Sequence, residues 1–288
     1  MSEIEVRRQA RTAPITYLLL TAAAVVTVVP FVWLVCAAFK TNADFFGSTF
    51  LPAGDGWLGI GWSRLTLDNF RRLLEDGLMG RALLNSVFLA STTSVLATLV
   101  CAMGGYSLAK LSFRGREMVT VLVLSALIVP PALLLAPGYQ LLFRLGLLDT
   151  FTGLILPAVA PAFGVYLFRQ SALGGVPTQL LEAARIDGAG ELRIFFTVAL
   201  PLLRPMAGAF ALITFLGTWN NFVSPQVVLQ TPGKFPLAVA VAQLKGVYYQ
   251  DYGLQMAGTL LSVAPVLVLF LILQREFIAG LTSGAVKG

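Results

Sequence analysis

Charged residues are distributed along the chain so that six long stretches contain no Asp, Glu, Lys or Arg. A helix needs about 20 mostly apolar residues to cross the hydrocarbon core of a bilayer. Transmembrane β-barrels would instead show segments of about 10 residues with alternating hydrophobicity, a pattern that this sequence lacks. The chain is therefore predicted to be an all-α, polytopic membrane protein with six transmembrane helices. The six stretches are Ile15–Phe39, Ala82–Ala109, Met118–Phe143, Thr150–Phe168, Pro205–Gly233 and Tyr252–Gln274.

Composition excludes several classes of protein. Of the 288 residues, 57% are hydrophobic and 12% are charged, whereas soluble domains carry about 25% charged residues. A soluble enzyme, a disordered chain and a nucleic-acid-binding domain are therefore ruled out. The chain has no histidine, and both cysteines, Cys36 and Cys101, lie inside apolar stretches, so neither a metal site nor a structural disulfide is expected.

The basic residues predict the orientation in the membrane. Six spans place both termini on one side, and 12 of the 20 Lys and Arg residues fall on the side of the termini, which predicts that this side is cytoplasmic. The first apolar run exceeds the 7–15 residues usual in a cleaved signal peptide, which favours a retained anchor. The predicted segments are a cytoplasmic N-terminus (1–13), an anchor helix (14–39), an extracytoplasmic loop (40–81), a five-helix core (82–274) that includes a cytoplasmic loop (170–204), and a cytoplasmic tail (275–288).

The cytoplasmic loop predicts two short helices joined by a turn. Pro177 suits the first turn of a helix, Glu182 and Arg185 are spaced as a surface ion pair, and Gly188 suits the left-handed position that ends a helix. A second helix is expected from near Glu191 to near Pro201. This protrusion either transmits movement between a cytoplasmic partner and the membrane helices or lies as an ordinary surface helix in the headgroup region.

Polar and aromatic residues inside two spans are candidates for lining a translocation pathway rather than for forming a binding site. Amides that pair with hydroxyl groups and rings that stack on a sugar occur together at Trp219, Asn220, Asn221 and Phe222, and again at Tyr139 and Gln140. Interfacial anchoring and hydrogen bonds between helices are the alternative explanations. Pro130, Pro131 and Pro137 predict kinks in the third span, either as a hinge or as static features of packing.

The spans contain no Asp, Glu, Lys, Arg or His, which disfavours an ion-coupled secondary transporter and an intramembrane enzyme. The chain also lacks a GxxxxGK[ST] phosphate-binding loop. If a nucleotide drives this protein, another chain must bind it.

One motif resembles that of a known family. Glu182-Ala183-Ala184, Gly188, Val198 and Leu200-Pro201 have the spacing of the EAA motif of binding-protein-dependent ABC importer permeases. The form EAARIDGA resembles the version in carbohydrate importers of the maltose type. The resemblance to the MalG-like subunit of those importers extends from about Pro14 to the C-terminus, and further matches are Asn85-Ser86, Tyr106–Lys110 with Phe113–Gly115, Trp219–Phe222 and Gly280–Gly288.

The resemblance implies a type I ABC importer fold in the bacterial cytoplasmic (inner) membrane. It also implies a MalF-like second permease, a P-loop ATPase homodimer that binds ATP and Mg, and an extracytoplasmic solute-binding protein, with no catalytic residue, cofactor or metal on this chain and no nucleic acid. A di- or oligosaccharide is the expected substrate; glycerol phosphate or a polyol remains an alternative.

The resemblance further assigns roles to individual residues. It implies that the loop forms a coupling helix, and that the ATPase contacts are made by Glu182, Ala183, Ala184, Asp187 and Gly188. In MalG-like subunits the C-terminal tail enters the ATPase dimer interface, which would place Gly284 and Lys287 against the partner. A frayed end is the other interpretation of this Gly-rich tail.

Overall fold

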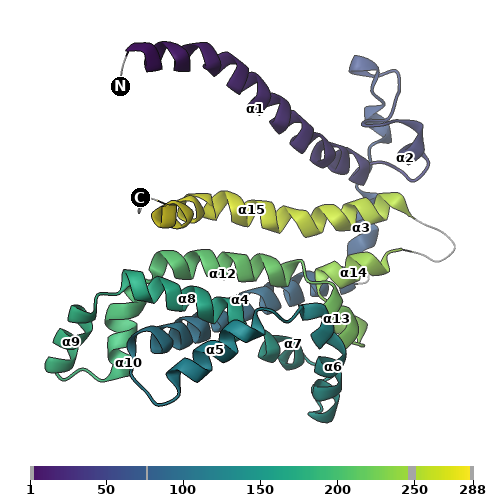
Figure 1. The fold of residues 1–288 in the computed structure, drawn as a ribbon. Coiled ribbons are helices and arrows are strands. Elements are labelled where there is room, and N and C mark those ends of the chain that lie inside the picture. Colours follow the sequence, from purple (N-terminus) through teal and green to yellow (C-terminus); the bar gives the residue numbers. More distant parts are fainter. Residues whose placement is uncertain (1–2, 76, 246–250, 286–288) are drawn as a thin grey trace. The chain divides into compact units, whose positions relative to one another are not determined.

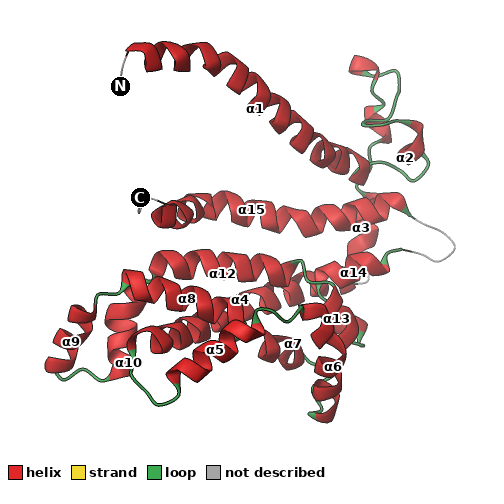
Figure 2. Cartoon of the chain, in the orientation of Figure 1, coloured by secondary structure: helices red, strands yellow, loops and turns green. Residues whose placement is uncertain are grey.

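The computed structural model describes residues 3–75, 77–245 and 251–285. Within these residues the chain consists of helices and connecting loops (Figure 2). One isolated β-bridge joins Ala53 and Ile60. The predicted all-α fold is therefore confirmed. The chain divides into two compact units, of which the first comprises Met1–Asp76 with Gln243–Ala264 and the second comprises Gly77–Ala242 with Pro265–Gly288.

The first unit begins with the long helix α1 (Glu3–Ala38). Its apolar side chains between Ile15 and Val35 are largely exposed, as expected of a helix whose surroundings are lipid. The start of α15 (Tyr252–Ala285) belongs to this unit, where Phe45 stacks on Tyr252 and Arg72 pairs with Asp251 at 2.8 Å. The short elements of the unit are α2 (Asp44–Gly47), η1 (Trp57–Gly59), η2 (Trp62–Arg64) and α3 (Asp68–Glu75).

The second unit is built around α4 (Leu78–Lys110), which packs against α8 (Ala162–Gly175) and α12 (Arg204–Trp219) (Figure 1). Small residues allow α4 and α8 to approach closely: a Cβ atom on Gly105 would lie 2.5 Å from the backbone nitrogen of Arg169. Around this contact lies a buried core that includes Cys101, Tyr106 and Phe168. The contact of α4 with α8 therefore depends on a residue without a side chain.

Six spans are the upper limit that the structure supports. Within the described residues, four helical segments are long and apolar enough to cross a membrane, and two bent helix pairs raise the number to six if each pair forms one span. The four segments are Pro14–Ala38, Leu78–Lys110, Phe151–Gly175 and Tyr252–Leu271. They correspond to the first, second, fourth and sixth predicted spans.

The third predicted span is broken. It consists of α5 (Arg116–Ala126) and the segment Pro131–Arg144, made of η3 (Pro131–Leu134) and α6 (Leu135–Arg144), and the two parts meet at 100°. The break falls at Pro130, whose ψ of 128° is extended, because a residue before proline is driven out of the helical region. The predicted kink is thus present, and its role as a hinge stays a prediction.

The ends of the fourth and fifth predicted spans were wrong. The fourth segment comprises α7 (Phe151–Ala158) and α8, and it continues past Phe168 to Gly175. The fifth does not run to Gly233, because α12 ends at Trp219 and a new helix, α13 (Val223–Val228), follows. The Asn221 side chain accepts a hydrogen bond from the Ser224 N–H at 3.2 Å, and such a side-chain cap starts a helix afresh. The chain continues through η5 (Pro232–Lys234) and α14 (Leu237–Gln243).

Candidate functional sites at the two ends of the second unit

The predicted cytoplasmic loop forms a helical hairpin at one end of the second unit, where α9 (Thr178–Ile186) is followed by α10 (Glu191–Ile194) (Figure 1). Gly188 has a φ of +80°, as expected for a left-handed helix end. The Gly188 N–H donates to the Arg185 carbonyl and the Ala189 N–H to the Ala184 carbonyl, each at 3.0 Å. These two bonds form a Schellman motif, so the turn predicted at Gly188 is present. After α10 the chain continues helically through η4 (Phe195–Ala199) and α11 (Leu200–Leu202).

The hairpin has one buried and one exposed face. Leu181 and Ile194 are fully buried in the core of the unit, which anchors both helices. On the opposite face Glu182, Ala183, Asp187 and Gly188 are exposed, and Ala184 is half-buried. Ile186 is 86% exposed. The tip therefore presents small residues, one large apolar side chain and two carboxylates on a firmly anchored support.

An ion pair closes the base of the hairpin. The Arg185 guanidinium donates to both carboxylate oxygens of Glu191, from Nε at 2.7 Å and from Nη2 at 3.4 Å. This hydrogen bond to Glu191 raises the pKa of Arg185. The predicted pairing of Arg185 with Glu182 was wrong, because the turn at Gly188 brings Glu191 within reach of the guanidinium. The Glu182 carboxylate consequently remains at the exposed tip.

A cavity of about 370 Å³ lies within the second unit, between α4, α6, α7, α12 and α13. Tyr139 and Asn221, two of the six residues predicted to line the translocation pathway, line this cavity. The sequence did not single out the hydroxyl-bearing residues beside them. They are Ser86, Thr93, Thr218 and Ser224.

The other four candidates do not line this cavity. The Trp219 ring is buried, 3% exposed, and stacks on Phe215. The Asn220 amide donates to the Leu216 carbonyl at 2.9 Å, while Phe222 and Gln140 are exposed elsewhere. Helix α12 ends between Trp219 and Asn221, so adjacent residues point in different directions and the predicted cluster is divided.

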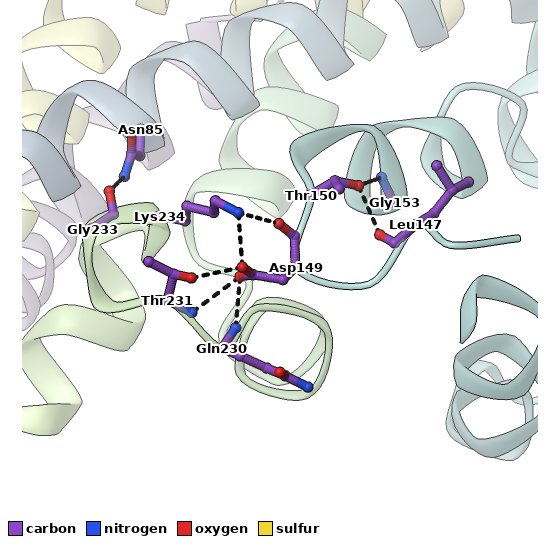
Figure 3. A network of polar contacts seen from close by, with 9 residues as sticks. All are labelled: Asn85, Leu147, Asp149, Thr150, Gly153, Gln230, Thr231, Gly233 and Lys234. Carbon is purple, nitrogen blue, oxygen red and sulfur yellow. Dashed lines mark hydrogen bonds and ion pairs between the residues drawn. The ribbon is translucent and has the colours of Figure 1, made fainter. Parts of the chain in front are cut away.

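Near the cavity a single carboxylate ties two loops together (Figure 3). Asp149 lies between α6 and α7 in a left-handed conformation with a φ of +55°. One of its oxygens accepts from the N–H groups of Gln230 (2.9 Å) and Thr231 (3.0 Å). The other accepts from the Thr231 hydroxyl (2.6 Å) and from Lys234 Nζ (2.8 Å). We call these four residues the Asp149 clamp.

The hydrogen bond from Lys234, together with those from Thr231 and Gln230, holds the pKa of the Asp149 carboxyl well below its usual range. This clamp was not predicted from the sequence, although the sequence contains a signal for it. Asp149 is the only acidic residue between Glu117 and Glu182, and Lys234 is the only charged residue between Arg204 and Lys245. Two isolated opposite charges in loops that flank apolar spans are candidates for a pair.

The predicted tail falls partly outside the described residues. Gly284 lies in the last turns of α15, which ends at Ala285, and Lys287 is beyond the described part of the chain. No group of three or more His, Cys, Asp or Glu residues that could hold a metal ion occurs in the described ranges.

Comparison with known proteins identifies relatives along nearly the whole chain. Residues 94–277 match the family described as binding-protein-dependent transport system inner membrane component. The arabinooligosaccharides transport system permease protein AraQ of Halalkalibacterium halodurans is 39% identical, with 96% of this chain and 99% of that protein covered. The melibiose/raffinose/stachyose import permease protein MelC of Bacillus subtilis is 31% identical, with 98% and 100% covered.

A solved structure supports the fold. The crystal structure of a bacterial ABC transporter involved in the import of the acidic polysaccharide alginate contains a chain that matches with a TM-score of 0.80. The match covers 94% of this chain and 98% of that chain at 21% sequence identity. The fold of this chain is thus similar to that of the matching chain.

Proposed function

We propose that this chain, which belongs to the family of binding-protein-dependent transport system inner membrane components, carries an oligosaccharide into the cytoplasm. As a member of this family it is a multi-pass inner-membrane permease subunit of an ABC importer. It works with an extracytoplasmic binding protein, and ATP is hydrolysed by a separate ATPase subunit. An ion-coupled secondary transporter and an intramembrane enzyme are excluded by this membership.

The substrate class is supported by the relatives. AraQ and MelC, which align over nearly all of this chain, are permeases for arabinooligosaccharides and for melibiose, raffinose and stachyose. Fold alone does not define a substrate, but identities above 30% over the full length make a shared class of substrate the leading hypothesis. Glycerol phosphate or a polyol is the alternative substrate.

The exposed tip of the helical hairpin is proposed to be the contact with the ATPase. The observation that carries this proposal is the Schellman turn at Gly188, which presents Glu182, Ala183 and Asp187 on helices anchored by Leu181 and Ile194. A rigid support transmits a displacement, whereas a flexible loop would absorb it. Small residues at the tip also allow a partner surface to approach closely.

We extend the proposal to the remaining partners and to the orientation of the chain. The translocation pathway would be shared with a MalF-like second permease, and two copies of the ATPase would contact the complex. The hairpin and both termini would face the cytoplasm. The end of α15 with Gly284, followed by Lys287, would reach the ATPase dimer.

A pull-down of the tagged chain in mild detergent, followed by mass spectrometry, tests the assembly. We expect a P-loop ATPase and a second, different permease to co-elute. A matched variant, Gly188→Asp, should recover the second permease but lose the ATPase, because only the hairpin tip is changed. Elution of the wild-type chain without any ATPase would contradict the assignment of the hairpin.

A further inference from the structure

We propose that the cavity of the second unit is a subsite on this chain for a neutral sugar unit of the transported oligosaccharide, an inference that rests on the proposed function. The cavity is formed by helices of this one chain. Its volume of about 370 Å³ lies near the lower end of the range of about 300–1,000 Å³ typical of small-molecule sites. This volume suits a small part of an oligosaccharide rather than a long chain.

The chemistry of the lining matches a polyhydroxyl ligand. Thr93, Tyr139, Thr218 and Ser224 line the cavity, and their hydroxyls form no hydrogen bond within the part of the chain that the structure describes. By contrast, a helical Ser or Thr commonly donates to the carbonyl one turn earlier, as Thr197 does at 2.7 Å. The cavity therefore combines several available hydroxyl groups with one aromatic side chain.

The lining also defines the charge of the ligand. None of the residues that line the cavity is Asp, Glu, Lys or Arg. Asp149 and Lys234, the nearby charged residues of the clamp, already satisfy each other. A buried charge without a counter-charge is strongly disfavoured. A neutral sugar therefore suits the cavity, whereas a sugar acid or glycerol phosphate would be left without a partner.

Hydrogen bonds between segments hold the walls of the cavity in place. The Asp149 clamp joins the start of α7 to the segment after α13. On α4, the Asn85 amide donates to the carbonyls of Gly233 (3.0 Å) and Phe235 (3.1 Å), and the Ser86 hydroxyl accepts from the Leu237 N–H at 2.7 Å. Walls that are already ordered lose little entropy when a ligand binds.

Sugar binding to the purified complex tests the inference. The binding protein first delivers tritiated raffinose, maltotriose or arabinotriose to the complex of both permeases and the ATPase. Vanadate then traps the complex in one state, and the Kd of the sugar that it retains is measured. The test variant combines Tyr139→Phe with Thr218→Val. The control variant combines Tyr166→Phe with Thr152→Val, which make the same chemical changes away from the cavity.

The double variant in the cavity should raise the Kd of a retained neutral sugar about tenfold, since each lost hydrogen bond contributes modestly. The control variant should keep the wild-type Kd and the wild-type rate of ATP hydrolysis without sugar. An unchanged Kd in the cavity variant would overturn the subsite. Equally tight retention of glycerol 3-phosphate or trigalacturonate by the wild type would overturn its neutral specificity.

A third result would identify failure of the proposed function itself. If no neutral oligosaccharide is transported by the reconstituted wild-type complex, while the ATPase and the second permease are present, the substrate class is wrong and the subsite is rejected with it. If a sugar is transported but its binding is insensitive to the cavity variant, only the subsite is rejected.

Discussion

Because α4 and α8 are in close contact, we predict opposite effects on stability when two adjacent glycines of α4 are replaced by alanine. A Cβ atom on Gly105 would lie 2.5 Å from the Arg169 nitrogen and 2.6 Å from the Phe168 Cβ. A Cβ atom on Gly104 would meet only the Val165 side chain, at 3.6 and 3.8 Å. The substitutions Gly105→Ala and Gly104→Ala therefore add the same methyl group, which clashes with α8 at position 105 but fits at position 104.

The magnitudes follow from these distances. Carbon atoms pack at about 3.5–4.0 Å, so the helices must separate by about 1 Å to accept Ala at position 105. Overpacking costs about 1–3 kcal/mol, and the upper end applies because backbone atoms of α8 cannot rotate away. Replacing Gly by Ala in a helix stabilises the helix by about 1 kcal/mol. Gly105→Ala should thus lower the free energy of unfolding by about 2 kcal/mol, whereas Gly104→Ala should raise it by up to about 1 kcal/mol.

Denaturant titration of the detergent-solubilised chain, followed by tryptophan fluorescence, measures both variants under the same conditions. Uptake by cells that carry each variant provides a second measurement, because α8 leads directly into the hairpin. We expect Gly105→Ala to impair uptake and Gly104→Ala to preserve it. Equal stability of the two variants would refute the close approach of these helices.

Two further substitutions and one deletion test the hairpin, the clamp and the tail. Gly188→Asp should abolish uptake while costing the fold only about 1 kcal/mol for the left-handed backbone, whereas Gly190→Asp, at an ordinary φ of −72°, should transport normally in the same cellular assay. Asp149→Asn should slow uptake into proteoliposomes, because Lys234 loses its counter-charge. Uptake at the wild-type rate in this variant would show that the clamp is dispensable. Since the pKa of Asp149 is lowered on folding, its contribution to the stability of the fold is present above the ordinary carboxyl pKa and is lost only at lower pH. Titration of Asp149 should therefore not alter wild-type uptake between about pH 5 and pH 8. Deleting Thr282–Gly288 should reduce ATP hydrolysis by the assembled complex but leave the isolated ATPase unaffected; equal rates in the complex would contradict a role for the tail.

Local patterns in the sequence were sufficient to predict the first, second and sixth spans and the hairpin turn. The absence of charge marks a membrane helix, and the position of Gly188 after α9 marks a helix end, because both depend on neighbouring residues only. The same local reasoning failed for Arg185. A spacing rule for a single helix pairs it with Glu182, but the turn that follows brings Glu191 closer.

Features that depend on tertiary structure were not predicted. The Asp149 clamp joins residues that lie 81 to 85 positions apart, so no local pattern reveals it. The end of α12 at Trp219 was missed because the following residues remain uncharged, and hydropathy alone does not distinguish a continuous span from a helix, a turn and a second helix. The division of the Trp219–Phe222 cluster between core, surface and cavity follows from that turn.

Helix α12 joins the two candidate sites directly. Its first residue, Arg204, follows the helical segment Glu191–Leu202, which meets it at 82°, and Thr218 near its other end lines the cavity. Its 16 residues span about 24 Å. If α12 moves as a rigid rod, a tilt of about 5° imposed at the hairpin displaces the cavity end by about 2 Å. Under the proposed function, the 82° bend before Arg204 lets α12 act as a lever, through which a small push at the hairpin tip changes the shape of the cavity wall.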